Sequence, residues 1–171
     1  MIYVRKAVLT DLETIMQIFE EARILLATDG STQWQNGQPN QSTFKQDIEN
    51  QECYVLIVSG QIAGMATLKQ EGDPNYQQIT AGKWHSHKRY VALHRVAISN
   101  KFRGKHLTSY FFSNLFTVIK GLGINTVRID THELNKRMQK VIINVGFIYC
   151  GIIYIARDPD PKRLAYDIEL T

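Results

Sequence analysis

The fold of this chain is decided by residues 91–123, which read VALHRVAISNKFRGKHLTSYFFSNLFTVIKGLG. The stretch begins with a β-branched apolar run too short for a helix, continues through a polar turn that contains Lys101, Arg103 and Lys105, and ends in a segment of helical period. This order predicts a strand, a cationic loop and a helix. A helix that starts directly after such a loop presents unpaired backbone N–H groups and the positive end of its dipole. The stretch therefore predicts a binding site for a ligand that carries phosphate.

A second predicted strand and one apolar helical face complete this unit. Apolar residues recur at helical spacing after the loop, and Gly121 and Gly123 follow as a C-terminal stop. Val127 and Ile129 then alternate with charged residues over 125–131, as in a strand. A strand, a helix and another strand in this order predict a parallel pair joined by a right-handed crossover.

The rest of the chain alternates between strand and helix patterns around this unit. Thr10 and Glu13 have the spacing of a capping box, which predicts the start of the first helix. Further elements are expected at residues 2–7 (strand), 12–26 (helix), 44–48 (helix), 52–58 and 61–69 (a hairpin), 135–144 (helix), and 148–157 and 164–170 (strands). We therefore expect an α/β fold with a mixed sheet.

Composition is that of an ordinary globular protein. Of 171 residues, 44% are hydrophobic and 21% are charged, which suits one domain spanning residues 1–171. No apolar stretch approaches the roughly 20 residues of a membrane span, so we expect a cytoplasmic protein without a membrane partner. The net charge of +4 is scattered rather than interleaved with aromatic residues, so we expect no nucleic-acid partner.

Cysteine and histidine spacing predicts neither a disulfide nor a metal site. Cys53 and Cys150 each stand in an apolar run, as reduced packing residues do. His85 and His87 share one side of an extended segment, but no cluster of cysteines or carboxylates accompanies them in the sequence. We therefore expect no metal.

Residues 91–123 and their neighbours resemble the GCN5-related N-acetyltransferase (GNAT) family. The acetyl-CoA motif of that family is a strand, a loop of the form Arg/Gln-x-x-Gly-x-Gly/Ala and a helix, and the loop here reads Arg-Gly-Lys-His-Leu-Thr at residues 103–108. Residues 5–19, RKAVLTDLETIMQIF, resemble the family's first strand and helix. Asn135 with Gly146 and Phe147 resembles its late Asn-helix-Gly-Phe pattern.

The resemblance implies a fold and a cofactor. It implies a mixed sheet of six or seven strands with about four helices, and acetyl-CoA wedged where the two central strands diverge. The residues that would contact the cofactor by position are Val96, Ala97 and Ile98 along the pantetheine arm, Arg103, Gly104, Lys105, His106, Leu107 and Thr108 around the pyrophosphate, and Asn135 near the thiol end. His106 and Thr108 stand where the family has Gly or Ala, so this loop lacks the conformational freedom of glycine.

Acetyl transfer to an amine needs a group that takes a proton, because a free amine is largely protonated at neutral pH. Several GNAT subfamilies place a Glu on the strand before the loop, and that position is Ala92 here. His94 lies on the same face of the predicted strand and is the first candidate base. A hydrogen-bonded structural histidine is the alternative. A second candidate group lies at the end of the next strand, with solvated strand-end polarity as its alternative; it comprises Asp130, Thr131, His132 and Glu133.

Two further catalytic tasks follow from the resemblance. The family's thiolate-protonating Tyr corresponds to Ile142 here, so that proton would come from Tyr149, Tyr154 or water. The oxyanion of the tetrahedral intermediate would be met by a backbone N–H near Val96 or Ala97.

The acceptor site is expected to contain aromatic residues. Trp34, Trp84 and Tyr90 stand in or beside the two long polar stretches, where they could form an apolar or cation-accepting pocket. For Trp34, packing on the core as a loop anchor is the alternative.

The resemblance therefore implies an N-acetyltransferase that transfers an acetyl group from acetyl-CoA to a primary amine of a small molecule, polyamine, amino acid or peptide. The departures from the motif leave a second hypothesis, a catalytically weakened acyl-CoA-binding or partner-binding module with the same fold. A homodimer is common in the family, and an exposed β edge at the C-terminus is one route to it.

Overall fold

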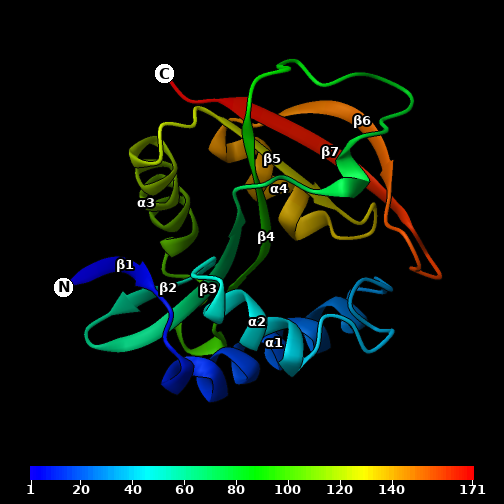
Figure 1. The fold of residues 1–171 in the computed structure, drawn as a ribbon. Helices are drawn as coiled ribbons and strands as arrows, with labels where there is room; N and C mark the ends of the chain where they lie inside the picture. Colours follow the sequence, from blue (N-terminus) through cyan, green and yellow to red (C-terminus); the bar gives the residue numbers. More distant parts are fainter.

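Seven strands form one mixed sheet in the order β1-β2-β3-β4-β5-β7-β6 (Figure 1). The computed structural model describes residues 1–171. The strands are β1 (Ile2–Lys6), β2 (Cys53–Val58), β3 (Gln61–Lys69), β4 (Tyr90–Ile98), β5 (Thr126–Thr131), β6 (Ile148–Tyr154) and β7 (Lys162–Glu169). Every neighbouring pair is antiparallel except β4 and β5. The predicted mixed sheet is confirmed.

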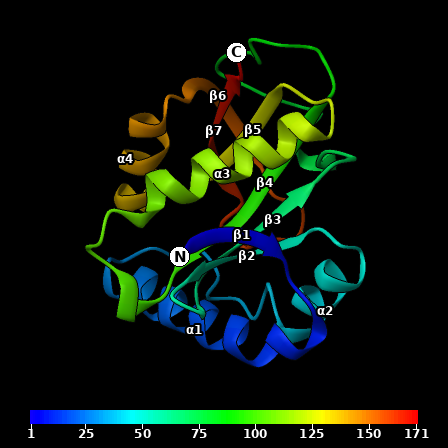
Figure 2. The ribbon, with the colours of Figure 1, turned by 90° about the vertical axis from the view of Figure 1, so that its left-hand side faces the viewer.

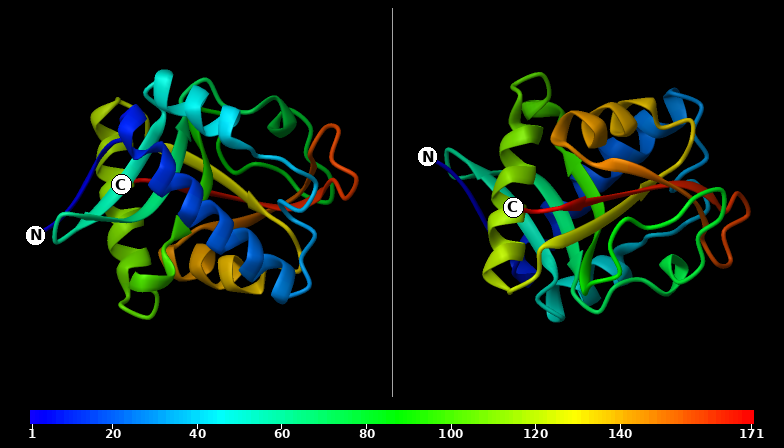
Figure 3. Two further views of the ribbon diagram at one scale, coloured as in Figure 1. Left: turned by 90° about the horizontal axis from the view of Figure 1, so that it is seen from below. Right: turned by 90° about the horizontal axis from the view of Figure 1, so that it is seen from above.

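Four helices cover the two faces of this sheet (Figures 2 and 3). They are α1 (Leu12–Thr28), α2 (Gln41–Glu49), α3 (Leu107–Gly121) and α4 (Lys136–Val145), with short 3-10 turns η1 (Leu9–Asp11), η2 (Pro74–Tyr76) and η3 (Asn100–Phe102). Strand β2 shows how the layers divide: Tyr54 and Leu56 pack in the core beneath α3 and α4, whereas Val55 and Ile57 pack with α1 and α2. This division follows from the alternation of side chains along a strand.

The central strands β4 and β5 run parallel and then separate. They pair only at three positions, Tyr90 with Thr126, Val91 with Val127 and Ala92 with Arg128. Beyond Ala92, the edge of β4 that faces β5 has no strand partner. The expected divergence of the two central strands is therefore confirmed.

A β-bulge in β4 changes which face its side chains occupy. His94 pairs with Thr67 and Ala97 with Met65, so two residues, Arg95 and Val96, face a single residue of β3. Arg95 has a φ of 53°, in the left-handed region. As a result Val96 packs in the core beneath α3, while His94 faces the opposite side of the sheet.

The first helix does not begin as the sequence pattern predicted. The expected capping box of Thr10 and Glu13 is not formed, because Asp11 takes its place: its Oδ2 accepts a hydrogen bond from the Val8 N–H over 2.8 Å. The Arg5 guanidinium donates to both carboxylate oxygens of Asp11, over 2.7 and 3.0 Å. The start of α1 is therefore anchored to β1.

The C-terminal strand is not at the edge of the sheet. Strand β7 lies between β5 and β6, so β6 is the outer strand on that side. The prediction of an exposed β edge at the C-terminus is therefore wrong.

Cys53 and Cys150 are both free and buried. None of the helices is both long enough and apolar enough to span a bilayer.

Candidate active site

A cavity of about 670 Å³ opens where β4 and β5 separate. Its walls include residues 93–98 of β4 and 129–131 of β5, the segments that follow the last paired residues of each strand. Further lining residues come from α1, the loop between α1 and α2, β3, the β3–β4 connection, the start of α3, α4, the β6–β7 loop and β7. The divergence of the two central strands is therefore what creates the space.

One end of this cavity lies at the start of α3. Ile98, Arg103 and Thr108 line it. Burial lowers the pKa of Arg103 from its usual value, although the guanidinium stays charged under all ordinary conditions. A cationic side chain beside a helix N-terminus forms an anion-binding site.

The other members of the predicted loop do not line the cavity. Gly104, Lys105 and His106 are exposed, and Leu107 is buried in the core. His106 nevertheless adopts a φ of 56° and a ψ of 26°, a left-handed conformation that glycine enters most easily. The backbone thus has a glycine-like turn although the residue is histidine.

Arg137, which the sequence patterns did not single out, is a second cation at this end. It lines the cavity from α4 and donates to both carboxylate oxygens of Asp29, over 2.6 and 3.2 Å. Asp29 follows the end of α1, so this ion pair joins helices on opposite faces of the sheet. No sequence signal indicated Arg137, because its partner is 108 residues away.

Asn135 lines the cavity beside these residues and also begins α4. Its Oδ1 accepts a hydrogen bond from the Met138 N–H over 3.1 Å, which is the side-chain cap of the helix. Asn135 therefore lines the cavity, as the prediction of a cofactor contact requires, and also caps α4.

His94 stands near the other end of the cavity, between two carboxylates. Its Nε2 lies 2.9 Å from Oδ2 of Asp73, and its Nδ1 lies 3.9 Å from Oδ1 of Asp130. All three side chains line the cavity. Tyr76, buried beside the His94 ring, donates a 2.6 Å hydrogen bond to Oδ1 of Asp130. Asp73 belongs to the long connection after β3, whose purpose the sequence left open.

The two carboxylates have pKa values displaced in opposite directions. Burial raises the pKa of Asp130. Burial would also raise the pKa of Asp73, but hydrogen bonds from His94 and Asn75 outweigh it and lower the pKa below its usual value. Perturbed titratable groups gathered in a cavity mark it as a candidate active site.

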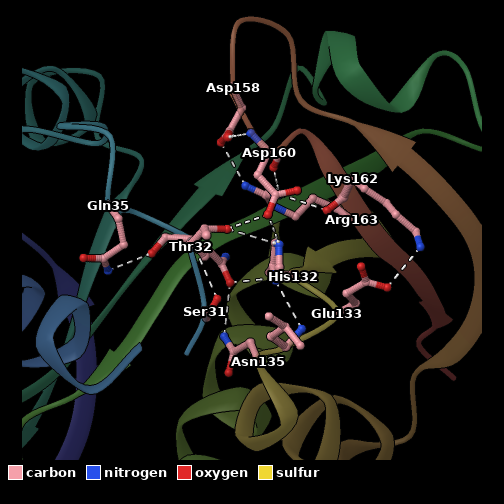
Figure 4. A network of polar contacts seen from close by, with 12 residues as sticks. Ser31, Thr32, Gln35, His132, Glu133, Asn135, Asp158, Asp160, Lys162 and Arg163 are labelled. Carbon is pink, nitrogen blue, oxygen red and sulfur yellow. Dashed lines mark hydrogen bonds and ion pairs between the residues drawn. The ribbon is translucent and has the colours of Figure 1, made fainter. Parts of the chain in front are cut away.

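The structure divides the second candidate group: Asp130 and Thr131 line the cavity, whereas His132 and Glu133 do not. His132 is buried, its Nε2 lies 2.8 Å from Oδ2 of Asp160, and its Nδ1 accepts the Leu134 N–H over 3.1 Å (Figure 4). Glu133 forms an ion pair with Lys162 at 3.0 Å (Figure 4). Both ring nitrogens of His132 are occupied, which indicates a structural histidine that ties β5 to the loop between β6 and β7.

Of the three predicted aromatic residues, only Trp34 lines the cavity. Trp34 also packs on Phe19 of α1, with ring centroids 5.4 Å apart. It therefore lines the cavity and anchors its loop to the core. Trp84 and Tyr90 lie outside the cavity, because their rings sandwich the buried guanidinium of Arg128 at 4.1 and 3.9 Å. The expectation that they face the acceptor is corrected by this packing.

The tyrosines proposed as proton donors also lie elsewhere. Tyr149 and Tyr154 are on β6, the outer strand; both are exposed and neither lines the cavity. Ile142 is fully buried in the core beneath α3.

His85 pairs with residues that the sequence did not connect to it. Its Nδ1 lies 2.8 Å from Oδ1 of Asp167 and 3.3 Å from Sγ of Cys150, and its backbone N–H donates to Oδ2 of Asp167. His87 is not part of this group. The paired contacts to Asp167 fasten the long connection to β7.

Comparison with known proteins gives one family. The model of the Acetyltransferase (GNAT) family matches residues 13–147. A GNAT-family acetyltransferase structure from Streptococcus agalactiae is 37% identical, with a TM-score of 0.89 over 99% of this chain and 95% of that one. A GNAT-family acetyltransferase structure from Listeria monocytogenes is 21% identical, with a TM-score of 0.74 over 99% of this chain and 95% of that one. At this identity the similarity concerns the fold alone.

A third structure was solved with a ligand. It is an acetyltransferase-fold protein from Salmonella typhimurium with its cofactor acetyl-CoA, 14% identical, with a TM-score of 0.71 over 100% of this chain and 95% of that one. At this identity the likeness concerns the fold alone. No sequence among curated proteins matched the chain.

Proposed function

This chain belongs to the GNAT family of acetyltransferases, and we propose that it transfers an acetyl group from acetyl-CoA directly to a primary amine. The acceptor would be a small molecule, a polyamine, an amino acid or a peptide. The observation that carries the proposal is the cavity itself, which connects the cationic start of α3 to the His94 imidazole. The acetyl-CoA-bound Salmonella structure of the same fold supports the choice of acyl donor.

The residues present fit acetyl-CoA. Arg103 and the N-terminus of α3 would hold the pyrophosphate, with Arg137 as a second cation nearby. The β4 edge from Leu93 onward lacks a strand partner, so its backbone groups at Val96–Ile98 are available to the amide-bearing pantetheine arm. Bound acetyl-CoA would supply an acetyl group activated as a thioester.

The chain's own residues would then do two things. His94 would take a proton from the acceptor, because an amine must lose its proton before its nitrogen has an electron pair for attack. A backbone N–H near Val96 or Ala97, beside the bulge, would stabilise negative charge that develops on the acetyl oxygen.

Isothermal titration with acetyl-CoA tests the cofactor part of this proposal. We expect wild-type protein to bind and the Arg103→Ala variant to bind about tenfold to a hundredfold more weakly, since a hydrogen bond to a charged group contributes roughly 1.5–3 kcal/mol. Lys120→Ala is the matched control, because Lys120 carries the same charge in the last turn of α3. Failure of the wild type to bind at concentrations well above micromolar would contradict the proposal.

A binding module without chemistry is the second candidate, favoured by one observation. The position of the family's thiolate-protonating Tyr holds Ile142, which is fully buried and offers no proton. Release of free thiol from acetyl-CoA across a panel of primary amines separates the two functions. A transferase releases thiol with at least one amine, whereas a module binds acetyl-CoA and releases none.

A further inference from the structure

The cavity contains a carboxylate–imidazole–carboxylate group formed by Asp73, His94 and Asp130. The three residues come from the β3–β4 connection, from β4 and from β5, so only the folded chain brings them together. Their side chains are 15%, 18% and 8% exposed, respectively, so each is mostly removed from solvent yet faces the cavity. Such a group can hold a cation and exchange a proton with it.

Asp73 determines which nitrogen of His94 is basic. A carboxylate only accepts hydrogen bonds, so Oδ2 of Asp73, 2.9 Å from Nε2, favours the neutral tautomer of His94 that carries its proton on Nε2. Asp73 is itself held in place, since its Oδ1 accepts hydrogen bonds from the backbone N–H and the side-chain amide of Asn75, over 2.7 and 2.8 Å. The free electron pair of His94 is therefore on Nδ1.

Nδ1 faces Asp130 across a gap that suits one donor group. The 3.9 Å separation between Nδ1 and Oδ1 of Asp130 is too long for a direct hydrogen bond. One nitrogen placed to the side of the line that joins them would lie within ordinary hydrogen-bond distance of both atoms. Tyr76, which is buried, holds Asp130 from the other side through its 2.6 Å hydrogen bond.

The unpaired negative charge of the two carboxylates at this end of the cavity also favours the binding of a cation. The other charged groups that line it are already paired: Arg163 with Asp158 at 2.9 Å, Lys69 with Asp47 at 2.9 Å, and Arg95 with Asp47 at 3.0 Å. Asp73 and Asp130 have no Lys or Arg partner and share only the His94 ring. Burial raises the pKa of Asp130, which an adjacent positive charge would offset.

We infer that the acceptor enters as an ammonium ion and docks between Nδ1 of His94 and the Asp130 carboxylate. This inference rests on the proposed function and adds two residues to it. One ammonium N–H bond breaks, an Nδ1–H bond forms, and the electron pair stays on the acceptor nitrogen. The resulting imidazolium lies between two carboxylates, which stabilise it, and it later releases its proton to solvent. Asp130 contacts the substrate, whereas Asp73 is a positioning residue that acts through His94.

The docking step can be tested without acetyl-CoA by NMR of the ¹⁵N-labelled histidine ring. We expect n-butylammonium to shift the His94 ring resonances and the uncharged n-butanol to leave them unchanged. Asp130→Asn, which keeps an oxygen for Tyr76, should reduce the response at least tenfold. Asp29→Asn, a carboxylate at the other end of the same cavity, should retain it. An unresponsive wild type, or an Asp130→Asn variant that responds as the wild type does, would overturn the inference.

Asp73→Ala provides the second readout, which does not depend on the stability of buried Asp130. The wild-type ring should show the tautomer protonated on Nε2, and Asp73→Ala should show a mixture of tautomers. In an acetylation assay this variant should lose kcat at least tenfold with less than a threefold change in the amine KM. An unchanged tautomer would refute the positioning role. If n-butylammonium shifts His94 but acetyl-CoA does not bind, the proposed function fails while the cation site stands.

Discussion

Nδ2 of Asn135 donates a hydrogen bond to Oε1 of Gln33 over 3.2 Å, across 102 residues of chain. Gln33 Oε1 also accepts the His132 N–H over 3.3 Å, and both Gln33 and Asn135 line the cavity. The loop after α1 is thereby attached to the start of α4. A single amide thus caps a helix through its oxygen and joins two walls of the cavity through its nitrogen.

Asn135→Ala should lower the free energy of unfolding by about 1 kcal/mol, because it removes the cap of α4. Asn135→Asp keeps the accepting oxygen of the cap but loses the hydrogen bond to Gln33, so its free energy of unfolding should lie between those of Asn135→Ala and the wild type. Urea denaturation measures both. Equal losses in the two variants would show that the hydrogen bond to Gln33, rather than the cap, carries the stability.

His106→Gly should raise the free energy of unfolding by up to about 1 kcal/mol, because it relieves a left-handed backbone conformation in a residue that has a Cβ. Lys105→Gly is the control. Lys105 is equally exposed and has no positive φ, so added glycine freedom there should only destabilise. Thermal denaturation compares the two, and a loss of stability in His106→Gly as large as that in Lys105→Gly would contradict the expected relief of strain.

Asp11 should make stability depend on pH on the acidic side. The ion pair with Arg5 lowers the pKa of Asp11 in the folded state, so its contribution is present above the unfolded value of about 3.9 and is lost as pH falls through the folded value. Asp11→Asn should therefore cost about 1 kcal/mol at neutral pH, because Arg5 is partly exposed and solvent screens the pair. Denaturant titrations should show this difference shrinking in strong acid; a difference that is independent of pH would refute the assignment.

The two tryptophans should respond differently to truncation. Trp84→Ala should lower the free energy of unfolding by about 3–5 kcal/mol, because the ring is buried against Arg128 and Tyr76. Trp34→Ala should cost less stability, since Trp34 is only partly buried, and should raise the KM for an amine acceptor. Calorimetric unfolding and steady-state kinetics measure the two effects. A larger KM change in the Trp84 variant than in the Trp34 variant would contradict the expected contact between the acceptor and Trp34.

Much of the fold was predictable because its signals are local. The strand, cationic loop and helix of residues 91–123 appear as β4, the turn before α3 and α3 itself, since apolar periodicity within a segment reports which face it buries. The start of α1 was not predictable in detail. Thr10 and Glu13 had the right spacing for a cap, but Arg5 on a neighbouring strand was available to hold Asp11 instead.

The candidate site was predictable only in part. Arg103, Thr108, Asn135 and His94 were expected from the sequence and all line the cavity. His132 was an equally reasonable candidate by residue type, yet Asp160 and the Leu134 N–H occupy both of its nitrogens. Which histidine is free to exchange a proton depends on its neighbours in space, and those come from loops far away in the chain.

The sequence by itself determined the order of strands and helices, the cationic turn and the family pattern, because each depends on residues within one or two turns of each other. Tertiary structure alone decided the left-handed backbone of His106 and the placement of Asp73 and Asp130 on either side of His94. These features arise from packing and hydrogen bonding between distant segments. No periodicity along the chain records contacts of that kind.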